Sequence, residues 1–265
     1  MSQCSSHGES QISGYGGKAV SFVKGGRPFY GETIGILLNK TEAPLLPGNV
    51  GNASTYDFPV RIKNLEDFPC DWWCDEEGPS RRRLEKFIKA AKRIEEEGVR
   101  AITTGCGFYA VFQQEASQAL RVPLFTSPLL MVPLVSRMIG GKKKVGILTA
   151  GAEGLKGPFL RNVGIDESVP IVVKGMEKME EFPQVYNYEK KLTTDTEILE
   201  REVVQVAKEL VAENPDIGAI VLECSDMPPF AAAVQEAVRL PIFDFIAFIN
   251  MVYMAVVKKR FDGFM

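Results

Sequence analysis

The sequence predicts an α/β fold of two pseudo-symmetric halves, each a three-layer unit with a mostly parallel sheet. The main observation is a motif that occurs twice, as Ala101-Ile-Thr-Thr-Gly-Cys-Gly-Phe108 and as Ala219-Ile-Val-Leu-Glu-Cys-Ser-Asp226. Each copy is a short apolar run typical of a buried strand, followed by a cysteine, turn-forming residues and an apolar helical pattern. Strands that alternate with helices indicate βαβ units and parallel sheets.

The repeat extends beyond the two cysteines. Ala119-Leu-Arg-Val-Pro-Leu-Phe125 matches Ala237-Val-Arg-Leu-Pro-Ile-Phe243 at the same offset of about 118 residues. Earlier in each half, Ile34-Gly-Ile-Leu-Leu38 resembles Val145-Gly-Ile-Leu-Thr149. Self-similarity of this kind indicates duplicated structural units. We therefore expect each half to bring one cysteine to the same structural corner.

The predicted domain organisation follows from these repeats. Residues 1–31 are rich in Gly and Ser and lack periodicity, which predicts a mobile N-terminal tail. Residues 32–140 form the first α/β subdomain and residues 141–244 the second. The C-terminal helical segment, 245–265, is expected to pack back on the first subdomain.

In the first subdomain, short apolar runs predict strands at 33–39, 58–62, 99–104 and 122–125. Helical periodicity predicts helices at 79–97, 108–120 and 129–139. Ser80 is placed to cap the first of these helices and Gly98 to end it.

The second subdomain repeats this alternation. Predicted strands cover 144–149, 171–174, 216–222 and 241–243. Predicted helices cover 155–162, 195–214 and 229–238, and the last helix of the chain 246–259. Thr194 is the expected cap of the long helix. Residues 176–192 are polar and mixed and predict no regular element.

Composition and charge exclude several classes of protein. A formal net charge of −3 and an isoelectric point near 5.5 argue against a nucleic-acid-binding surface. No apolar stretch reaches the ~20 residues of a membrane span, and the N-terminus has no signal pattern, so we expect a cytoplasmic protein. Its five cysteines should then be thiols. A homodimer remains open.

The loop over 42–57 is rich in Gly and Asn, including Asn49 and Asn52. Such residues allow left-handed backbone and leave amides free to bind an anion. Because the loop follows the first strand, where open α/β sheets bind ligands, both asparagines are candidate binding residues; an ordinary surface loop is the alternative. Cys70 and Cys74 have too few partners for a zinc site, since the chain has one His, and no metal is expected.

Cys106 and Cys224 follow predicted strands, at the carboxyl edge of each sheet where ligands bind. Each also precedes a predicted helix, whose positive N-terminal end should lower the thiol pKa and attract a carboxylate. If the halves pack about a pseudo-twofold axis, the two thiols face each other across one cleft. One thiolate and one thiol on opposite sides of a carbon can invert a stereocentre without a cofactor.

Three segments carry a family resemblance: Val145-Gly-Ile-Leu, Thr103-Thr-Gly-Cys-Gly-Phe108 and Leu222-Glu-Cys-Ser-Asp-Met-Pro-Pro229. They look like the aspartate/glutamate racemase superfamily, which includes amino-acid and hydantoin racemases, maleate isomerase and arylmalonate decarboxylase. The resemblance begins near residue 33 and extends to the C-terminus. It implies two α/β subdomains with the active site between them, and cofactor-independent proton transfer in which Cys106 and Cys224 are the catalytic acid/bases.

The resemblance also implies substrate-binding residues. Thr149 matches a threonine that contacts substrate in the superfamily. Gly107 and Phe108 replace the usual Asn-Thr and offer only backbone amides, whereas Ser225 replaces a Thr and keeps a hydroxyl. Asp226 would repel a carboxylate unless it is turned away or paired with an ammonium group. These departures argue against glutamate or aspartate as substrate.

The leading hypothesis is a cofactor-independent racemase or epimerase of an amino acid or related carboxylic acid. Glu223 is a further residue that could tune the neighbouring thiol or hold a substrate ammonium group. A second hypothesis keeps the fold but uses one cysteine, as in a decarboxylase or a maleate-type cis–trans isomerase. The third is a non-catalytic, two-lobed protein that binds a small anion.

Overall fold

The computed structural model describes residues 25–27, 30–65, 81–188 and 190–265. Most of the predicted tail, the loop with Cys70 and Cys74, and the Ser80 cap lie outside the described residues. Within the described ranges, no helix combines the length and apolar character that a membrane crossing requires.

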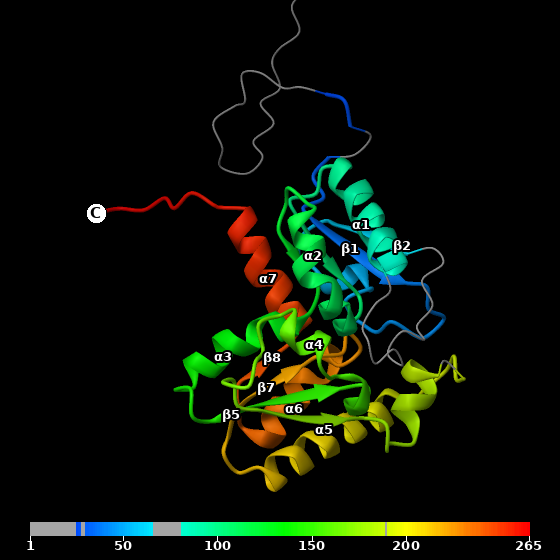
Figure 1. The fold of residues 1–265 in the computed structure, drawn as a ribbon, viewed down its shortest axis with the longest axis vertical. Coiled ribbons are helices and arrows are strands. Elements are labelled where there is room, and N and C mark those ends of the chain that lie inside the picture. Colours follow the sequence, from blue (N-terminus) through cyan, green and yellow to red (C-terminus); the bar gives the residue numbers. More distant parts are fainter. Residues whose placement is uncertain (1–24, 28–29, 66–80, 189) are drawn as a thin grey trace, which may run out of the picture.

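Two four-stranded parallel sheets form the framework (Figure 1). The first has the order β2-β1-β3-β4 and consists of β1 (Ile34–Asn39), β2 (Val60–Leu65), β3 (Ala101–Thr104) and β4 (Leu124–Phe125). The second has the order β6-β5-β7-β8 and consists of β5 (Lys144–Thr149), β6 (Ile171–Gly175), β7 (Ile217–Leu222) and β8 (Ile242–Phe243). The matching order and direction confirm the predicted pair of α/β units.

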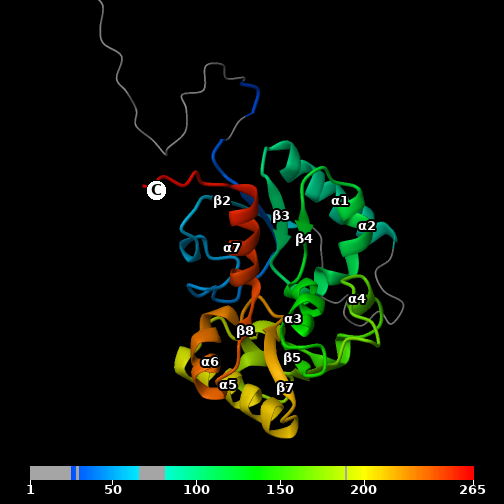
Figure 2. The same cartoon turned by 90° about the vertical axis from the view of Figure 1, so that its left-hand side faces the viewer.

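Helices cover both faces of the first sheet. Figure 2 shows α1 (Arg81–Glu96) and α2 (Gln113–Gln118) on one side and α7 (Phe245–Val256) on the other. The α1 helix buries Phe87, Ala91 and Ile94, which recur at helical spacing. The α7 helix is held by aromatic contacts, with Phe248 5.0 Å from Phe125 and Tyr253 stacked 3.6 Å from Phe58, measured between ring centroids.

The second sheet is covered in the same manner. The helices α5 (Thr196–Glu213) and α6 (Ala231–Val238) pack against each other, and α3 (Val132–Met138) contacts β5. The predicted cap Thr194 is wrong, because the side chain of Asp195 accepts the hydrogen bond from the Glu197 amide at 2.9 Å. Thr194 instead donates to Glu181 at 2.8 Å.

Two predicted helices are shorter than expected. The helix predicted over 108–120 begins with a 3-10 turn, Gly107–Phe112, and only then becomes α2. The helix predicted over 155–162 is reduced to α4 (Pro158–Arg161), because Gly157 precedes it with a positive φ of 51°. Residues 183–187, which gave no pattern, form a single π-helical turn.

Each half sends one connection onto the other. The β1–β2 connection reaches the second half, where Gly48 lies so close to Pro229 that an added Cβ would be 2.9 Å from its Cα. The β5–β6 connection contains α4, which packs on the turn after Cys106. There Phe159 meets Phe108 edge-on, with ring centroids 5.4 Å apart. These reciprocal contacts fix how the two carboxyl edges face each other.

Candidate active site

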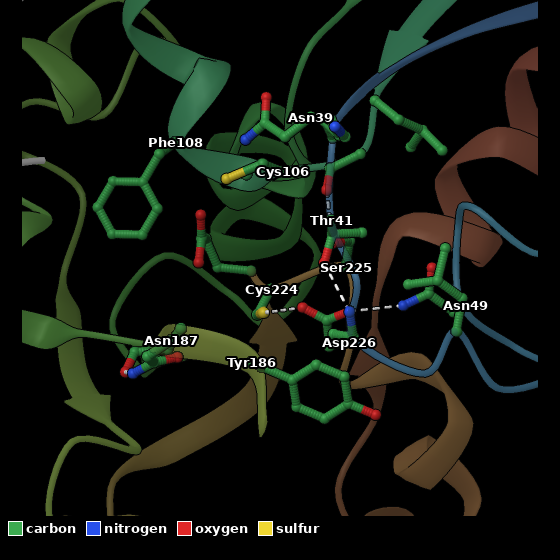
Figure 3. Close-up of a pocket in the computed structure, with 18 of the residues that line it drawn as sticks. Asn39, Thr41, Asn49, Cys106, Phe108, Tyr186, Asn187, Cys224, Ser225 and Asp226 are labelled. Atoms are coloured by element: carbon green, nitrogen blue, oxygen red, sulfur yellow. Dashed lines mark hydrogen bonds between the residues drawn. The ribbon is translucent and has the colours of Figure 1, made fainter. Parts of the chain in front are cut away.

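A cavity of about 410 Å³ lies where the carboxyl edges of the two sheets meet. It is lined by residues that directly follow β1, β3, β5 and β7, together with the segment 186–188. Cys106 and Cys224 both line it, and Figure 3 shows them on opposite sides of the same space. The repeat therefore brings its two thiols to one cavity.

Cys106 enters the cavity from the turn after β3 and is partly exposed. The following residue, Gly107, is packed against the opposite half. A Cβ at position 107 would lie 2.1 Å from Glu223 Oε1 and 2.4 Å from the Glu223 carbonyl oxygen. Only glycine fits there without moving the backbone, which explains why a glycine follows this cysteine.

Cys224 is buried, at 8% exposure, and is held by a short chain of polar contacts. Its Sγ donates to Asp226 Oδ2 at 3.4 Å, and Asp226 Oδ1 accepts from Asn49 Nδ2 at 2.6 Å (Figure 3). Burial raises the pKa of Cys224 well above its ordinary value, and the charges of Asp226 and Glu223 raise it further. The predicted lowering of this thiol pKa is therefore wrong. No helix begins at Cys224, since the next helical turn is the 3-10 helix Pro228–Phe230, which leads into α6.

Glu223 is 1% exposed and lines the cavity between the two cysteine loops. Its Oε2 accepts a hydrogen bond from Thr149 Oγ1 at 2.7 Å, whereas its Oε1 has no hydrogen-bond partner among the described residues. Burial raises the pKa of Glu223 to about 7, against the lowering effect of the Thr149 hydrogen bond. Thr149 itself is fully buried, is not among the residues that line the cavity, and holds Glu223 through this hydrogen bond.

Most of the remaining candidate residues line the cavity, and one of them stabilises a loop next to it. Gly107, Phe108, Ser225 and Asp226 line the cavity, as does Asn49. Asn52 does not line it. Its side chain donates to the Leu45 carbonyl at 2.9 Å and accepts from the Ser54 amide at 2.9 Å, which stabilises the loop.

Sequence reasoning missed part of the wall. Tyr186, Asn187 and Tyr188 line the cavity from the segment that carried no periodic signal. Burial raises the pKa of Tyr186, and nearby Asp226 and Cys224 add to this effect. Lys40 also lines the cavity, and its position directly after the first strand is the signal that could have indicated it.

The charge of the wall is uneven. Among the described lining residues, Lys40 is the cation, while Glu223 and Asp226 are carboxyl groups. The described residues contain no cluster of three His, Cys, Asp or Glu side chains that could hold a metal ion. Two thiols and two carboxyl groups on one small cavity can exchange protons with a bound molecule.

The solved structures that resemble this fold share its two-sheet arrangement. A Gly74Cys mutant of arylmalonate decarboxylase superposes with a TM-score of 0.60 at 16% identity, covering 86% of this chain and 95% of that one. Glutamate racemase from Francisella tularensis in complex with D-glutamate gives a TM-score of 0.51 at 16% identity, covering 85% and 81%. At these identities the comparison establishes the fold, that of the Asp/Glu racemase superfamily.

No established protein-family profile matches the chain. A dimethylsulfoniopropionate lyase from Durusdinium sp. clade D is 32% identical over 207 residues, which cover 76% of this chain and 67% of the relative. The chain belongs to the dimethylsulfoniopropionate lyase family. The chain has the two-sheet fold of these Asp/Glu racemase-like structures, so the predicted resemblance is confirmed. Dimethylsulfoniopropionate lyase 7 of Emiliania huxleyi is 33% identical over 174 residues, and the match spans only 50% of that longer relative.

Proposed function

We propose that this chain is a cofactor-independent enzyme that uses its cysteines to remove a proton next to a carboxylate, and that its substrate is dimethylsulfoniopropionate or a closely related sulfonium carboxylate. The observation that carries the proposal is the pair of thiols, Cys106 and Cys224, on one small cavity. Membership of the lyase family supports the substrate class.

The proposed reaction is an elimination. A base removes a proton from C2, the carbon next to the carboxylate. The C2–H electron pair forms the C2=C3 double bond, and the C3–S bond breaks with its electron pair leaving on sulfur. The products are acrylate and dimethyl sulfide, and the proton remains on the base. The step is redox-neutral and needs no co-reactant.

The charges of the cavity suit a substrate with a cation at one end and an anion at the other. Glu223 and Asp226 can face the sulfonium group, and the rings of Tyr186 and Phe108 add surfaces that attract cations. Lys40 is the lining residue that can face the carboxylate. An amino-acid carboxylate placed beside Asp226 would be repelled, so this orientation favours a β-sulfonium acid.

Cys224 is the proposed base, acting with Asp226. Its thiol donates to Asp226 at 3.4 Å, which provides a route for the proton. Burial, and then the negative charges of Asp226 and Glu223, keep Cys224 protonated. A cation bound beside these charges offsets their part of the effect and so favours the thiolate. Cys106, on the other side, is the proposed hydrogen-bond donor to the substrate carboxylate, where negative charge develops.

The test incubates purified full-length protein with dimethylsulfoniopropionate and measures dimethyl sulfide in the headspace and acrylate by NMR. Equal amounts of both products support the proposal. Cys224→Ser and Cys106→Ser should each lower kcat/KM by roughly 100-fold or more, the usual size of an acid–base contribution. Deuterium uptake at C2 of 3-(trimethylammonio)propionate, which has a poorer leaving group, should be lost in Cys224→Ser. Full activity in both variants contradicts the thiol mechanism.

A second candidate is a two-base racemase or epimerase, and the placement of the thiols on opposite sides of one cavity favours it. It predicts loss of optical rotation and deuterium uptake at Cα in heavy water for a panel of amino acids and hydantoins. Stereochemical inversion without cleavage of the sulfonium acid would select this candidate. An arylmalonate and maleate in the same panel test for decarboxylase and cis–trans isomerase activity.

A further inference from the structure

The carboxyl group of Glu223 is buried in the cavity wall with one oxygen uncommitted. Thr149 Oγ1 donates to Oε2 at 2.7 Å, and Oε1 has no hydrogen-bond partner among the described residues. A buried polar atom without a partner is costly, and native proteins retain one mainly where a ligand or a bound water completes it. Oε1 itself has almost no accessible surface, so the carboxyl group of this lining residue acts on a molecule in the cavity through its charge.

Oε1 of Glu223 lies between the loop that carries Cys106 and the loop that carries Cys224. It lies directly against Gly107, because a Cβ there would be 2.1 Å away. Glu223 is followed in the chain by Cys224, and Gly107 is preceded by Cys106. The carboxyl group thus lies between the two thiol loops, next to the centre of the proposed reaction.

The other carboxyl group of the wall is already engaged. Asp226 Oδ1 accepts from Asn49 at 2.6 Å, and Oδ2 accepts from the Cys224 thiol at 3.4 Å. The lining cation, Lys40, is exposed and makes no hydrogen bond or ion pair with either carboxyl group among the described residues. Of the two acidic side chains, Glu223 has the free oxygen.

We propose that Glu223 is the specificity-determining residue that selects substrates with a fixed positive charge, because its buried carboxylate charge lies in the cavity wall beside the sulfonium or quaternary ammonium group. This inference rests on the proposed function and identifies how the cation is recognised. A sulfonium group has no N–H or O–H to donate, so recognition depends on charge and on the surrounding rings. When a cation binds, its attraction to the buried carboxylate offsets the free-energy cost of keeping that carboxylate away from water.

The experiment compares two ligands of the same shape. The first ligand, 3-(trimethylammonio)propionate, is a zwitterion with a fixed cationic end; the second, its isostere 4,4-dimethylpentanoate, has the same shape and carboxylate but a neutral tert-butyl group in place of the cation. Calorimetric titration of the full-length protein at pH 8 should show the cation binding about tenfold or more tightly than the isostere. Glu223→Gln, which keeps the shape of the side chain, should bring the two affinities to within about twofold. An unchanged ratio in this variant, or failure of the wild type to prefer the cation or to bind either ligand, overturns the proposal.

Two control variants show whether the preference for the cation depends on Glu223 and not on another acidic residue. Glu180→Gln makes the same chemical change at an exposed position and should leave the ratio unchanged. Asp226→Asn should keep most of the preference for the cation. If Asp226→Asn abolishes the preference while Glu223→Gln retains it, Asp226 is the selecting residue and the proposal is wrong.

The wild type gives an independent test that needs no variant. The preference for the cation should fall as pH drops below about 7, where Glu223 becomes protonated in the empty cavity. The other ionisable groups on the wall remain in Glu223→Gln; they are Lys40, Cys106, Tyr186, Tyr188, Cys224 and Asp226. A ratio that stays constant from pH 8 to pH 5.5, or a pH dependence that persists in Glu223→Gln, contradicts the assignment.

Failure of this inference can be separated from failure of the proposed function. If dimethylsulfoniopropionate is cleaved but Glu223→Gln keeps the ligand preference, the function stands and the role of Glu223 is refuted. If the preference depends on Glu223 but no sulfonium acid is cleaved, the cation site stands and the proposed reaction is refuted.

Discussion

Ser225 Oγ donates a hydrogen bond to the carbonyl oxygen of Gly105 at 2.6 Å, across 120 positions of sequence. Ser225 follows Cys224, and Gly105 precedes Cys106. This bond therefore joins the two cysteine loops directly. Together with the Asn49–Asp226 bond, it sets the separation of the thiols across the cavity.

Ser225→Ala should loosen this junction. Loss of the bond should lower the free energy of unfolding by about 1 kcal/mol and lower kcat/KM more than the stability change alone explains, because the thiols lose their spacing. Urea unfolding and the cleavage assay measure the two effects. Ser117→Ala is the matched control, since Ser117 donates to the Gln114 carbonyl at 3.1 Å on the surface. Equal effects of the two variants would show that the junction has no special role.

Gly107→Ala should disturb the cavity floor. The added methyl group meets both the side chain and the backbone of Glu223, and the backbone cannot move away at low cost. We expect a loss of roughly 1–3 kcal/mol in stability and a large loss of activity. Gly151→Ala is the control, because an added Cβ there has no heavy atom within 4 Å among those considered. Thermal unfolding compares them, and a Gly107→Ala variant with wild-type Tm and turnover contradicts the prediction.

Glu223→Gln should become more stable relative to wild type as pH rises. The folded-state pKa is about 7 against an ordinary value of 4.5, so the folded protein holds this proton more tightly than the unfolded chain. The stability from this group is fully present below pH 4.5 and is lost as pH rises through about 7. Relative to wild type, the free energy of unfolding of the variant should therefore increase by up to about 3 kcal/mol between pH 4.5 and pH 8.

Urea unfolding at pH 5 and pH 8 measures this change. Glu181→Gln serves as the control of opposite sign, because hydrogen bonds from Lys191 and Thr194 lower the pKa of Glu181. Its stabilising contribution is present above the unfolded pKa and is lost only at lower pH. Glu181→Gln should thus be less stable than wild type by the same amount at pH 5 and pH 8. A pH-independent difference for Glu223→Gln would refute the predicted shift.

Glu202→Ala should weaken substrate binding from a distance. The Glu202 carboxylate accepts hydrogen bonds from the amides of Glu180, Glu181 and Phe182, at 2.7 to 3.0 Å, just before the turn that carries Tyr186. Without it these amides lose their partner and the turn is no longer held against the cavity. We expect KM to rise several-fold with a smaller change in kcat. Glu200→Ala, on the exposed side of the same helix, should leave both parameters unchanged.

The sheets and the thiols could be predicted because they depend on local patterns. Buried strands are apolar runs, and the duplicated motif predicts that Cys106 and Cys224 lie at equivalent strand ends. The contact between Asn49 and Asp226 joins positions 177 residues apart, and no periodicity signals such a pair. The wall formed by Tyr186 was missed because its segment is polar and irregular.

Two departures from the sequence predictions have a common physical cause. The family resemblance implies that Thr149 contacts substrate, whereas its buried hydroxyl donates to the carboxyl group of Glu223. The thiol pKa of Cys224 was expected to follow a helix end, whereas burial and neighbouring carboxyl groups decide it. Both depend on which groups surround a side chain in three dimensions, which a single sequence does not specify.

The reciprocal connections between the halves carry a consequence for ancestry. The β1–β2 connection supports the loop after Cys224, and the equivalent β5–β6 connection supports the loop after Cys106. Two identical copies of one half, related by a twofold axis, could make both contacts at once. A symmetric dimer of a half-length progenitor would thus already possess a cavity with two thiols. Duplication and fusion of its gene would then allow the two sides of the cavity to diverge, one into an acidic wall and the other into a glycine-lined wall.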